Sequence, residues 1–178
     1  MNTDAMTLWL TGRPCAGKST LAEALEQKLK KAGIRVARLD GDDLRSKMNA
    51  DLGFSESDRK ENLRRAAQMA QVFNDNGSCV IAAFVSPTHE MRRMVRGIVR
   101  NFKLCYVQCG AEVCESRDVK GMYKKARQGK IKDFTGVSAP FEEPRDAEIV
   151  VDTEHRDLEQ CVEEVFKTLE IQGRPERS

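Results

Sequence analysis

Short apolar stretches alternate along the chain with segments in which apolar residues recur every three or four positions. The short stretches are typical of buried strands and occupy residues 7–10, 36–39, 79–85, 104–107 and 149–151. The segments between them have the spacing of amphipathic helices. Strands that alternate with helices form a parallel sheet with helices packed on its faces. We therefore predict an α/β fold with a three-layer arrangement.

Helix signals support this order of elements. Apolar residues of the first predicted helix share one face, and Gly33 follows as a stop. Residues 55–58 resemble a capping box that opens a long helix towards residue 76. A last helix at 158–169 precedes a polar tail at about 172–178, which we expect to fray. The predicted buried stripe of the long helix consists of Leu63, Ala66, Ala67, Ala70 and Phe73.

Two segments are rich in basic residues. Residues 88–100 form a predicted helix with four arginines, Arg92, Arg93, Arg96 and Arg100. We interpret them as a solvated face, with a ligand or partner surface as the alternative. Residues 118–139 contain many Lys, Arg and Gly residues and few apolar ones, which predicts a mobile surface segment. This segment suits a lid over phosphates.

The segment between the first strand and the first helix matches the phosphate-loop pattern, G-x-x-x-x-G-K-S. Its glycines allow a tight turn, and its amides and the following helix amino terminus would face an anion. Lys18 should reach the β- and γ-phosphates, and the Ser19 hydroxyl is placed to ligate Mg²⁺. The pattern therefore predicts binding of a nucleoside triphosphate. The residues expected to bind it are Gly12, Cys15, Ala16, Gly17, Lys18, Ser19 and Thr20.

Length and composition limit the remaining possibilities. The 178 residues suffice for one full core, so we predict a single domain over residues 1–178. A net charge of +2 gives no reason to expect a nucleic-acid partner. The longest apolar run is too short to span a bilayer, and residues 1–6 lack the core of a signal peptide. We expect a cytoplasmic protein with no membrane partner.

Six cysteines occur in the chain, without a C-x-x-C motif. Since nothing in the sequence is secretory, we expect reduced thiols. Metal binding by Cys105, Cys109 and Cys114 is the alternative, but Cys105 and Cys109 bracket an apolar strand segment and neither histidine is close in sequence. Structural burial is the favoured interpretation.

Carboxylates and an arginine follow the second predicted strand, in the run 39–45, LDGDDLR. The carboxyl end of such a strand opens towards the ligand crevice. Asp42 can meet both the metal and an acceptor hydroxyl, and Arg45 can pair with an anionic acceptor. A polar turn that caps a helix at Leu44 is the plainer alternative. The N-K-x-D motif of many GTPases and the L-S-G-G-Q motif of transport ATPases are absent from the sequence, which disfavours both classes.

These motifs, together with blocks further along, resemble the adenylylsulfate kinases, which phosphorylate adenosine 5′-phosphosulfate (APS) on its 3′-hydroxyl with ATP. The resemblance covers nearly the whole chain in order, and the blocks at 54–65 and 120–136 are specific to this family among phosphate-loop kinases. The matching blocks are the phosphate loop and the segments 39–45, 52–65, 82–87, 114–118, 120–127 and 134–136. The resemblance implies a P-loop kinase fold with a mobile lid at about 118–139, ATP as the phosphoryl donor, and Mg²⁺.

The resemblance also assigns roles to residues. Lys18, Asp42 and Ser86 would form the catalytic centre, with Ser86 contacting substrate rather than acting as a nucleophile. Ser19 and Asp42 would serve at the metal, and Arg117 would lie against the ATP adenine. Phe54 and Phe134 would sandwich the acceptor adenine, although core packing is the alternative for each and a hydrophobic staple is possible at Phe54. The acceptor-binding set is Asp42, Arg45, Phe54, Arg59, Asn62, Val85, Ser86, Lys120 and Phe134.

The chain also departs from the family pattern. Residues 13–15, Arg-Pro-Cys, replace the more usual Leu-Ser-Gly, and Asp43, Met122 and Asp133 stand where Asn, Leu and Gly are common. Two alternatives therefore stay open: a related small-molecule or nucleotide kinase, and a non-catalytic nucleotide-binding subunit of a sulfate-activating complex. The resemblance further implies a homodimer and a possible association with ATP sulfurylase.

Overall fold

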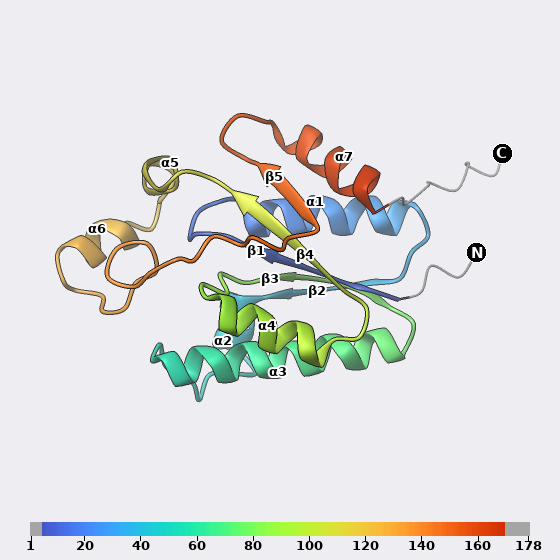
Figure 1. The fold of residues 1–178 in the computed structure, drawn as a ribbon, viewed down its shortest axis with the longest axis horizontal. Coiled ribbons are helices and arrows are strands. Elements are labelled where there is room, and N and C mark those ends of the chain that lie inside the picture. Colours follow the sequence, from blue (N-terminus) through green and yellow to red (C-terminus); the bar gives the residue numbers. More distant parts are fainter. Residues whose placement is uncertain (1–4, 170–178) are drawn as a thin grey trace.

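The computed structural model describes residues 5–169. Within this range five strands and seven helices follow one another in the predicted alternation (Figure 1). The strands are β1 (Thr7–Thr11), β2 (Val36–Asp40), β3 (Cys79–Ala83), β4 (Phe102–Gln108) and β5 (Ile149–Asp152). The helices are α1 (Lys18–Lys31), α2 (Gly41–Ser46), α3 (Glu56–Asp75), α4 (His89–Ile98), α5 (Ala111–Ser116), α6 (Met122–Arg127) and α7 (Leu158–Thr168). The tail predicted at 172–178 lies outside the described residues.

The five strands form one parallel sheet in the order β2-β3-β1-β4-β5. β1 is central, with Thr7 opposite Val80 of β3 and Phe102 of β4. The chain runs from β1 to β2 and β3 on one side of β1 and then crosses from β3 to β4 and β5 on the other side. The crevice beyond the carboxyl end of β1 is therefore the switch point at which open α/β sheets bind ligands. The phosphate loop leaves β1 at this point.

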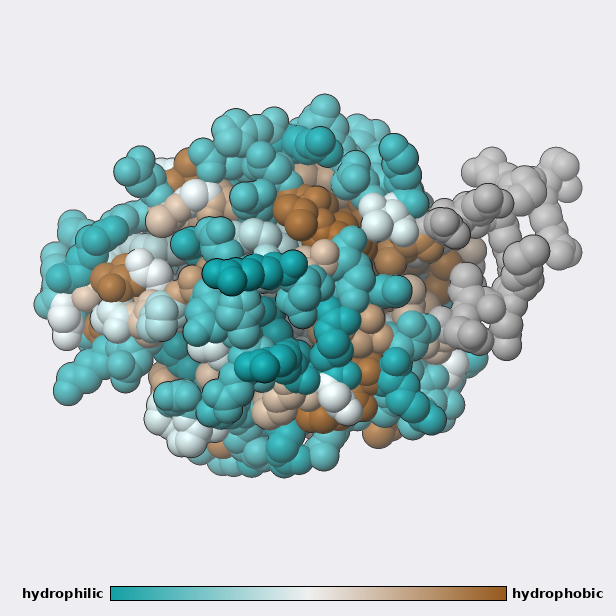
Figure 2. Space-filling view, viewed as in Figure 1, coloured by the Kyte–Doolittle hydropathy of each residue, from teal (hydrophilic) through white to brown (hydrophobic). Residues whose placement is uncertain are grey.

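Helices cover both faces of the sheet, which confirms the predicted three layers. In Figure 1, α1 and α7 lie on one face and α3 and α4 on the other, while α5 and α6 extend beyond one end of the sheet. Leu21 and Val165 belong to the buried cluster of the first face, and Trp9 and Val95 to that of the second. The surface in Figure 2 is mainly hydrophilic, with smaller hydrophobic areas between charged groups. No helix among residues 5–169 is long and apolar enough to cross a membrane.

Two predictions about helix faces are wrong. Phe73 is 36% exposed, because the partly buried Asn74 is turned inward in its place. The Asn74 amide accepts from Thr7 Oγ1 and donates to the carbonyl of Ser78. The arginines of residues 88–100 are not a common solvated face either. Arg92 is 3% exposed and Arg96 is paired with Glu148, since the segment before β5 packs across α4. The remaining stripe of α3 is buried as predicted.

The cysteines follow the favoured interpretation of buried thiols. All six are free, and all except Cys15 are buried. Cys105 is fully buried, and desolvation raises the pKa of its thiol far above the ordinary value. These side chains therefore contribute to the core as small hydrophobic groups.

Candidate active site

The phosphate loop joins β1 to α1 through two left-handed residues. Cys15 has φ 65° and Gly17 has φ 97°, so the backbone turns back on itself before α1 begins at Lys18. At Gly12 the loop passes so close to β4 that a Cβ would lie 2.6 Å from the carbonyl oxygen of Val107. A side chain at position 12 would therefore push the loop away from the sheet.

Lys18 is folded over this loop. Its ammonium group donates to the carbonyl oxygens of Gly12 and Arg13 at 2.9 and 2.8 Å, and the residue is only 9% exposed. Burial lowers the pKa of Lys18 to about 8. A triphosphate in the loop would supply a negative counter-charge for this buried ammonium group, whose partners here are neutral carbonyl oxygens.

A hydroxyl and a carboxylate meet beside the loop. Ser19 Oγ donates to Asp40 Oδ2 at 2.6 Å, and Asp40 also caps α2 by accepting from the amide of Asp42. Hard oxygen donors of this kind are the ligands that Mg²⁺ prefers, so this pair fits the ion that accompanies ATP. Sequence reasoning placed Asp42 there instead. The Asp42 carboxylate is 89% exposed and lies 4.0 Å from the Lys120 ammonium.

Asp40 was thus missed as a candidate, although a signal was present. It is the last residue of β2, which is separated from β1 by β3 in the sheet, and the carboxyl ends of these parallel strands open at the same edge as the phosphate loop. The predicted helix cap at this turn is present, and the role of these carboxylates at a metal and an acceptor stays a prediction. Asp40 performs the capping, which leaves Asp42 free to face the crevice.

A cavity of about 1160 Å³ connects the phosphate loop to the segments predicted to bind an acceptor. Gly12 and Ala16 belong to the phosphate loop but are buried and do not line the cavity. The other predicted residues do line it, namely Cys15, Gly17, Lys18, Ser19, Thr20, Asp42, Arg45, Phe54, Arg59, Asn62, Val85, Ser86, Arg117, Lys120 and Phe134. Tertiary structure thus brings together residues that are more than 100 positions apart in the sequence.

The two predicted stacking aromatics differ in their surroundings. Phe54 is 65% exposed, and the guanidinium of Arg45 lies 4.6 Å from the centre of its ring. This exposure rules out core packing for Phe54. Phe134 is half-buried and meets the ring of Tyr123 edge-on at 5.0 Å. Burial is the main cause of a lowered pKa at Arg45, which an anionic ligand would offset.

The predicted lid segment is attached to the site at two places. Tyr123 in α6 is 1% exposed and donates its hydroxyl to the carbonyl of Pro14 in the phosphate loop at 2.8 Å. Arg59 of α3 donates to Thr135 Oγ1 at 3.1 Å and to the carbonyl of Asp133. The expectation of a purely surface segment is therefore wrong around Tyr123, because this aromatic side chain packs against the core. The mobility of the segment stays a prediction.

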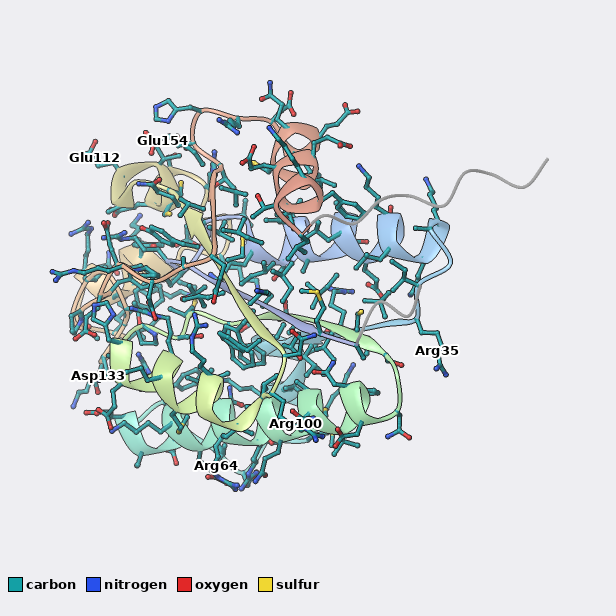
Figure 3. The ribbon with its side chains drawn as sticks, turned by 45° about the vertical axis from the view of Figure 1, so that its right-hand side comes forward. Arg35, Arg64, Arg100, Glu112, Asp133 and Glu154 are labelled. Atoms are coloured by element: carbon teal, nitrogen blue, oxygen red, sulfur yellow. The ribbon has the colours of Figure 1, made fainter. Side chains whose placement is uncertain are left out.

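The predicted lid segment lies beyond one end of the sheet (Figure 1). Figure 3 shows Asp133 of this segment and Arg35, which precedes β2, at opposite ends, while Arg64 and Arg100 project outward from the helical layer. Since Arg35 marks the amino end of the parallel strands, the lid stands at their carboxyl end. This is the edge at which the phosphate loop opens.

Ser86 follows β3 in a strained conformation. Its φ is 42°, a left-handed value that is costly for a residue with a side chain. The indole of Trp9 donates to Ser86 Oγ at 2.8 Å, and Arg92 donates to the carbonyl of Ser86 at 2.7 Å. The turn also explains why β3 ends at Ala83 and not at residue 85 as predicted.

Arg117 is held at the other side of the loop. It donates to the carbonyl of Thr153 at 2.7 Å, and Thr153 in turn donates to the carbonyl of Ala16 at 2.7 Å. Sequence reasoning missed Thr153, since no local pattern shows that the residue after β5 reaches the phosphate loop. These contacts link Arg117 through Thr153 to the phosphate loop, and its role at the ATP adenine stays a prediction.

Comparison with known proteins agrees with this geometry. A sequence profile of the adenylylsulphate kinase family matches residues 4–152. The chain belongs to the adenylylsulfate kinase family. It is 49% identical over 167 residues to a probable adenylyl-sulfate kinase of Halalkalibacterium halodurans, with 93% of this chain and 83% of the relative covered. It is 47% identical to the adenylyl-sulfate kinase of Prochlorococcus marinus, with the same shares covered.

A solved structure supports the same assignment. The APS kinase of Mycobacterium tuberculosis, in complex with AMPPNP and APS, superposes with a TM-score of 0.90 and 38% identity. The alignment covers 94% of this chain and 98% of that one. The α/β P-loop kinase fold expected from the sequence of this adenylylsulfate kinase family member is therefore confirmed.

Proposed function

We propose that the protein transfers the γ-phosphoryl group of ATP to the 3′-hydroxyl of APS, giving 3′-phosphoadenosine 5′-phosphosulfate (PAPS) and ADP in sulfate activation. The proposal rests on one continuous cavity that joins the phosphate loop to the exposed ring of Phe54 and to Arg45 and Arg59. Its volume of about 1160 Å³ exceeds the usual 300–1000 Å³ of a site for one small ligand. Family membership supports this acceptor.

The donor half of the reaction rests on the phosphate loop. Lys18 would leave the carbonyl groups of Gly12 and Arg13 to donate to the β- and γ-phosphates, which restores the favourable environment of its charge. Ser19 and Asp40 would hold Mg²⁺, which neutralises charge that spreads over the transferred group. The protein itself would form no covalent bond, because the main requirement is that it holds the two substrates in line for direct transfer.

Asp42 would orient the attacking hydroxyl. Its carboxylate projects into the cavity from the first turn of α2, between the phosphate loop and the acceptor side. Hydrogen bonding from the ribose 3′-hydroxyl to this carboxylate would direct an oxygen lone pair at the γ-phosphorus. The nearby Lys120 would carry positive charge towards the transferred group when the lid closes.

The acceptor half rests on aromatic and cationic side chains. Phe54 and Phe134 would hold the adenine between them. Both rings line the cavity, and the exposed ring of Phe54 and the half-buried ring of Phe134 each leave surface for a base to stack on. Arg45 and Arg59 would pair with the phosphosulfate. Arg59 already uses its guanidinium to hold the lid, so acceptor binding and lid position are coupled through this residue.

The proposal is tested by measuring Mg²⁺-dependent ADP release with APS, AMP, CMP and UMP as acceptors and by identifying the phosphorylated product. Selective 3′-phosphorylation of APS supports it. Activity on a different acceptor would overturn the assigned substrate, and binding of ATP and APS without ADP release would favour a non-catalytic subunit. Removal of Mg²⁺ with a chelator should stop turnover.

The catalytic assignments are tested by Lys18→Ala and Asp42→Ala. Each should abolish measurable turnover while the urea unfolding midpoint stays close to that of the wild type for Asp42→Ala, whose side chain is exposed. Exposed Glu90→Ala on α4 serves as a control outside the cavity. An Asp42→Ala protein with near-normal turnover would remove the role given to this carboxylate.

Four further expectations stay predictions. They are a single domain over residues 1–178, a homodimer, a cytoplasmic location and association with ATP sulfurylase. The last of these rests on family resemblance alone. Light scattering of the purified protein and copurification with ATP sulfurylase would test the two assembly predictions.

A further inference from the structure

We propose that Asn49 determines which edge of the Asn62 side-chain amide faces the acceptor, and that it acts as a positioning residue. This inference rests on the proposed function, in which Asn62 contacts the acceptor. Both asparagines are 3% exposed, but only Asn62 is among the residues that line the cavity. Asn49 would therefore act through Asn62 and not by touching substrate.

The backbone fixes Asn49 at the base of the loop between α2 and α3. Its amide donates to the carbonyl of Leu44 at 2.8 Å, and its carbonyl accepts from Leu52 at 3.1 Å. From this position Asn49 Nδ2 donates to Asn62 Oδ1 at 2.9 Å. The loop that carries Phe54 is thereby tied to the first half of α3.

Arg65 sets the direction of this hydrogen bond. Its Nη1 atom lies 3.4 Å from Asn49 Oδ1, and a guanidinium has only donors. Asn49 must therefore turn its oxygen towards Arg65 and its NH₂ group towards Asn62. Arg65 is itself held by both oxygens of Asp51, at 2.8 and 2.9 Å, and by Glu61 at 2.9 Å.

The consequence for Asn62 is a fixed donor. Its Oδ1 is occupied by Asn49, and no group in residues 5–169 accepts from its Nδ2. The NH₂ group is left to donate to an acceptor oxygen, such as that of a ribose hydroxyl or the phosphosulfate. The reverse orientation would aim a carbonyl oxygen at an anionic ligand, which would repel it.

The test compares Asn49→Asp with Asn49→Ala. A carboxylate keeps the shape of the side chain and can still accept from Arg65, but it cannot donate to Asn62. Asn62 then has to turn its NH₂ group towards position 49 and its oxygen towards the cavity. We expect KM for APS to rise about tenfold or more in Asn49→Asp, with KM for ATP unchanged.

The alanine variant separates orientation from packing. Asn49→Ala removes more contacts and should be the less stable protein in urea. It leaves the Asn62 amide free to rotate, so its NH₂ group can still face the acceptor. KM for APS should therefore rise less in Asn49→Ala than in Asn49→Asp. Asn74→Asp is the matched control, since Asn74 is a hydrogen-bonded amide on the same helix outside the cavity. Its KM for APS should not change.

The possible results divide cleanly. An unchanged KM for APS in Asn49→Asp, with active wild-type protein, would overturn this inference alone. The inference would also be overturned if KM for APS and KM for ATP rose together and were larger in the less stable of the two Asn49 variants, because that result indicates a purely structural role. Wild-type protein that does not phosphorylate APS would overturn the proposed function and this inference together.

Discussion

Replacing Arg92 by alanine should destabilise the protein and loosen the Ser86 turn. Arg92 donates to the carbonyl of Ser86 at 2.7 Å and to the carbonyl of Glu142 at 2.6 Å, and it is 3% exposed. Hydrogen bonds from a charged donor contribute about 1.5–3 kcal/mol each, so two of them give roughly 3–6 kcal/mol. Alanine also removes the cost of burying the guanidinium, a cost that appears as a lowered pKa of Arg92.

We therefore expect the Arg92→Ala change to lower the free energy of unfolding by about 3 kcal/mol. For a chain of this length, 1 kcal/mol corresponds to roughly 2–4 °C, so the melting temperature should fall by about 6–12 °C. The left-handed conformation of Ser86 costs of order 1–3 kcal/mol. Once its carbonyl is released, the turn can relax, and KM for APS should rise.

Urea unfolding followed by circular dichroism measures the first effect, and initial rates at saturating ATP measure the second. Arg93→Ala is the control, because Arg93 is the exposed neighbour on the same helix and should leave both quantities unchanged. An Arg92→Ala protein as stable as the wild type would refute the reasoning, since it would show that the buried hydrogen bonds add nothing beyond the cost of burying the charge.

Three further predictions follow from the site. Burial lowers the pKa of Lys18 to about 8, and only the protonated amine pairs with phosphate, so kcat/KM for ATP should fall as pH rises above about 8. The unfolded chain keeps this proton up to the ordinary pKa of 10.5, whereas the native state releases it above about 8, so the free energy of unfolding should rise with pH between these two values. A flat kcat/KM profile up to pH 9.5 would contradict the role assigned to Lys18. Phe54→Ala should raise KM for APS without lowering the urea midpoint, because the ring is 65% exposed, and a large loss of stability would restore core packing as its role. Trp9 is the single tryptophan and donates to Ser86 Oγ, so its fluorescence should change when APS is added, whereas Ser86→Ala should shift the emission of the free protein.

Much of the fold was predictable because it depends on local spacing. The five strands occur where apolar runs were seen, and the ends of the long helix α3 lie within a residue of the prediction, with Ser55 accepting from the amide of Asp58 as its cap. The failures have tertiary causes. Phe73 is exposed and Asn74 is turned inward instead, because the Asn74 amide bonds to Thr7 of β1 and to the carbonyl of Ser78. Arg92 was taken for a surface charge because its burial depends on the turn after β3, which presents the carbonyl of Ser86, and on Glu142, which lies 50 positions further along the chain.

The candidate site divides in the same way. Lys18 and Ser19 were identified because the phosphate loop is a contiguous motif whose backbone geometry is local. Asp40 was passed over because the choice among neighbouring carboxylates depends on which one reaches Ser19 across the sheet.

The sequence by itself determined the alternation of strands and helices, the phosphate loop and the family to which the chain belongs. Each of these follows from residues that are close together or from motifs in a fixed order. Only the tertiary structure decided the pairing of Ser19 with Asp40, the burial of Arg92 and the orientation of the Asn62 amide by Asn49. Burial and hydrogen-bond direction depend on partners that the fold supplies from other elements, and a linear pattern does not contain that information.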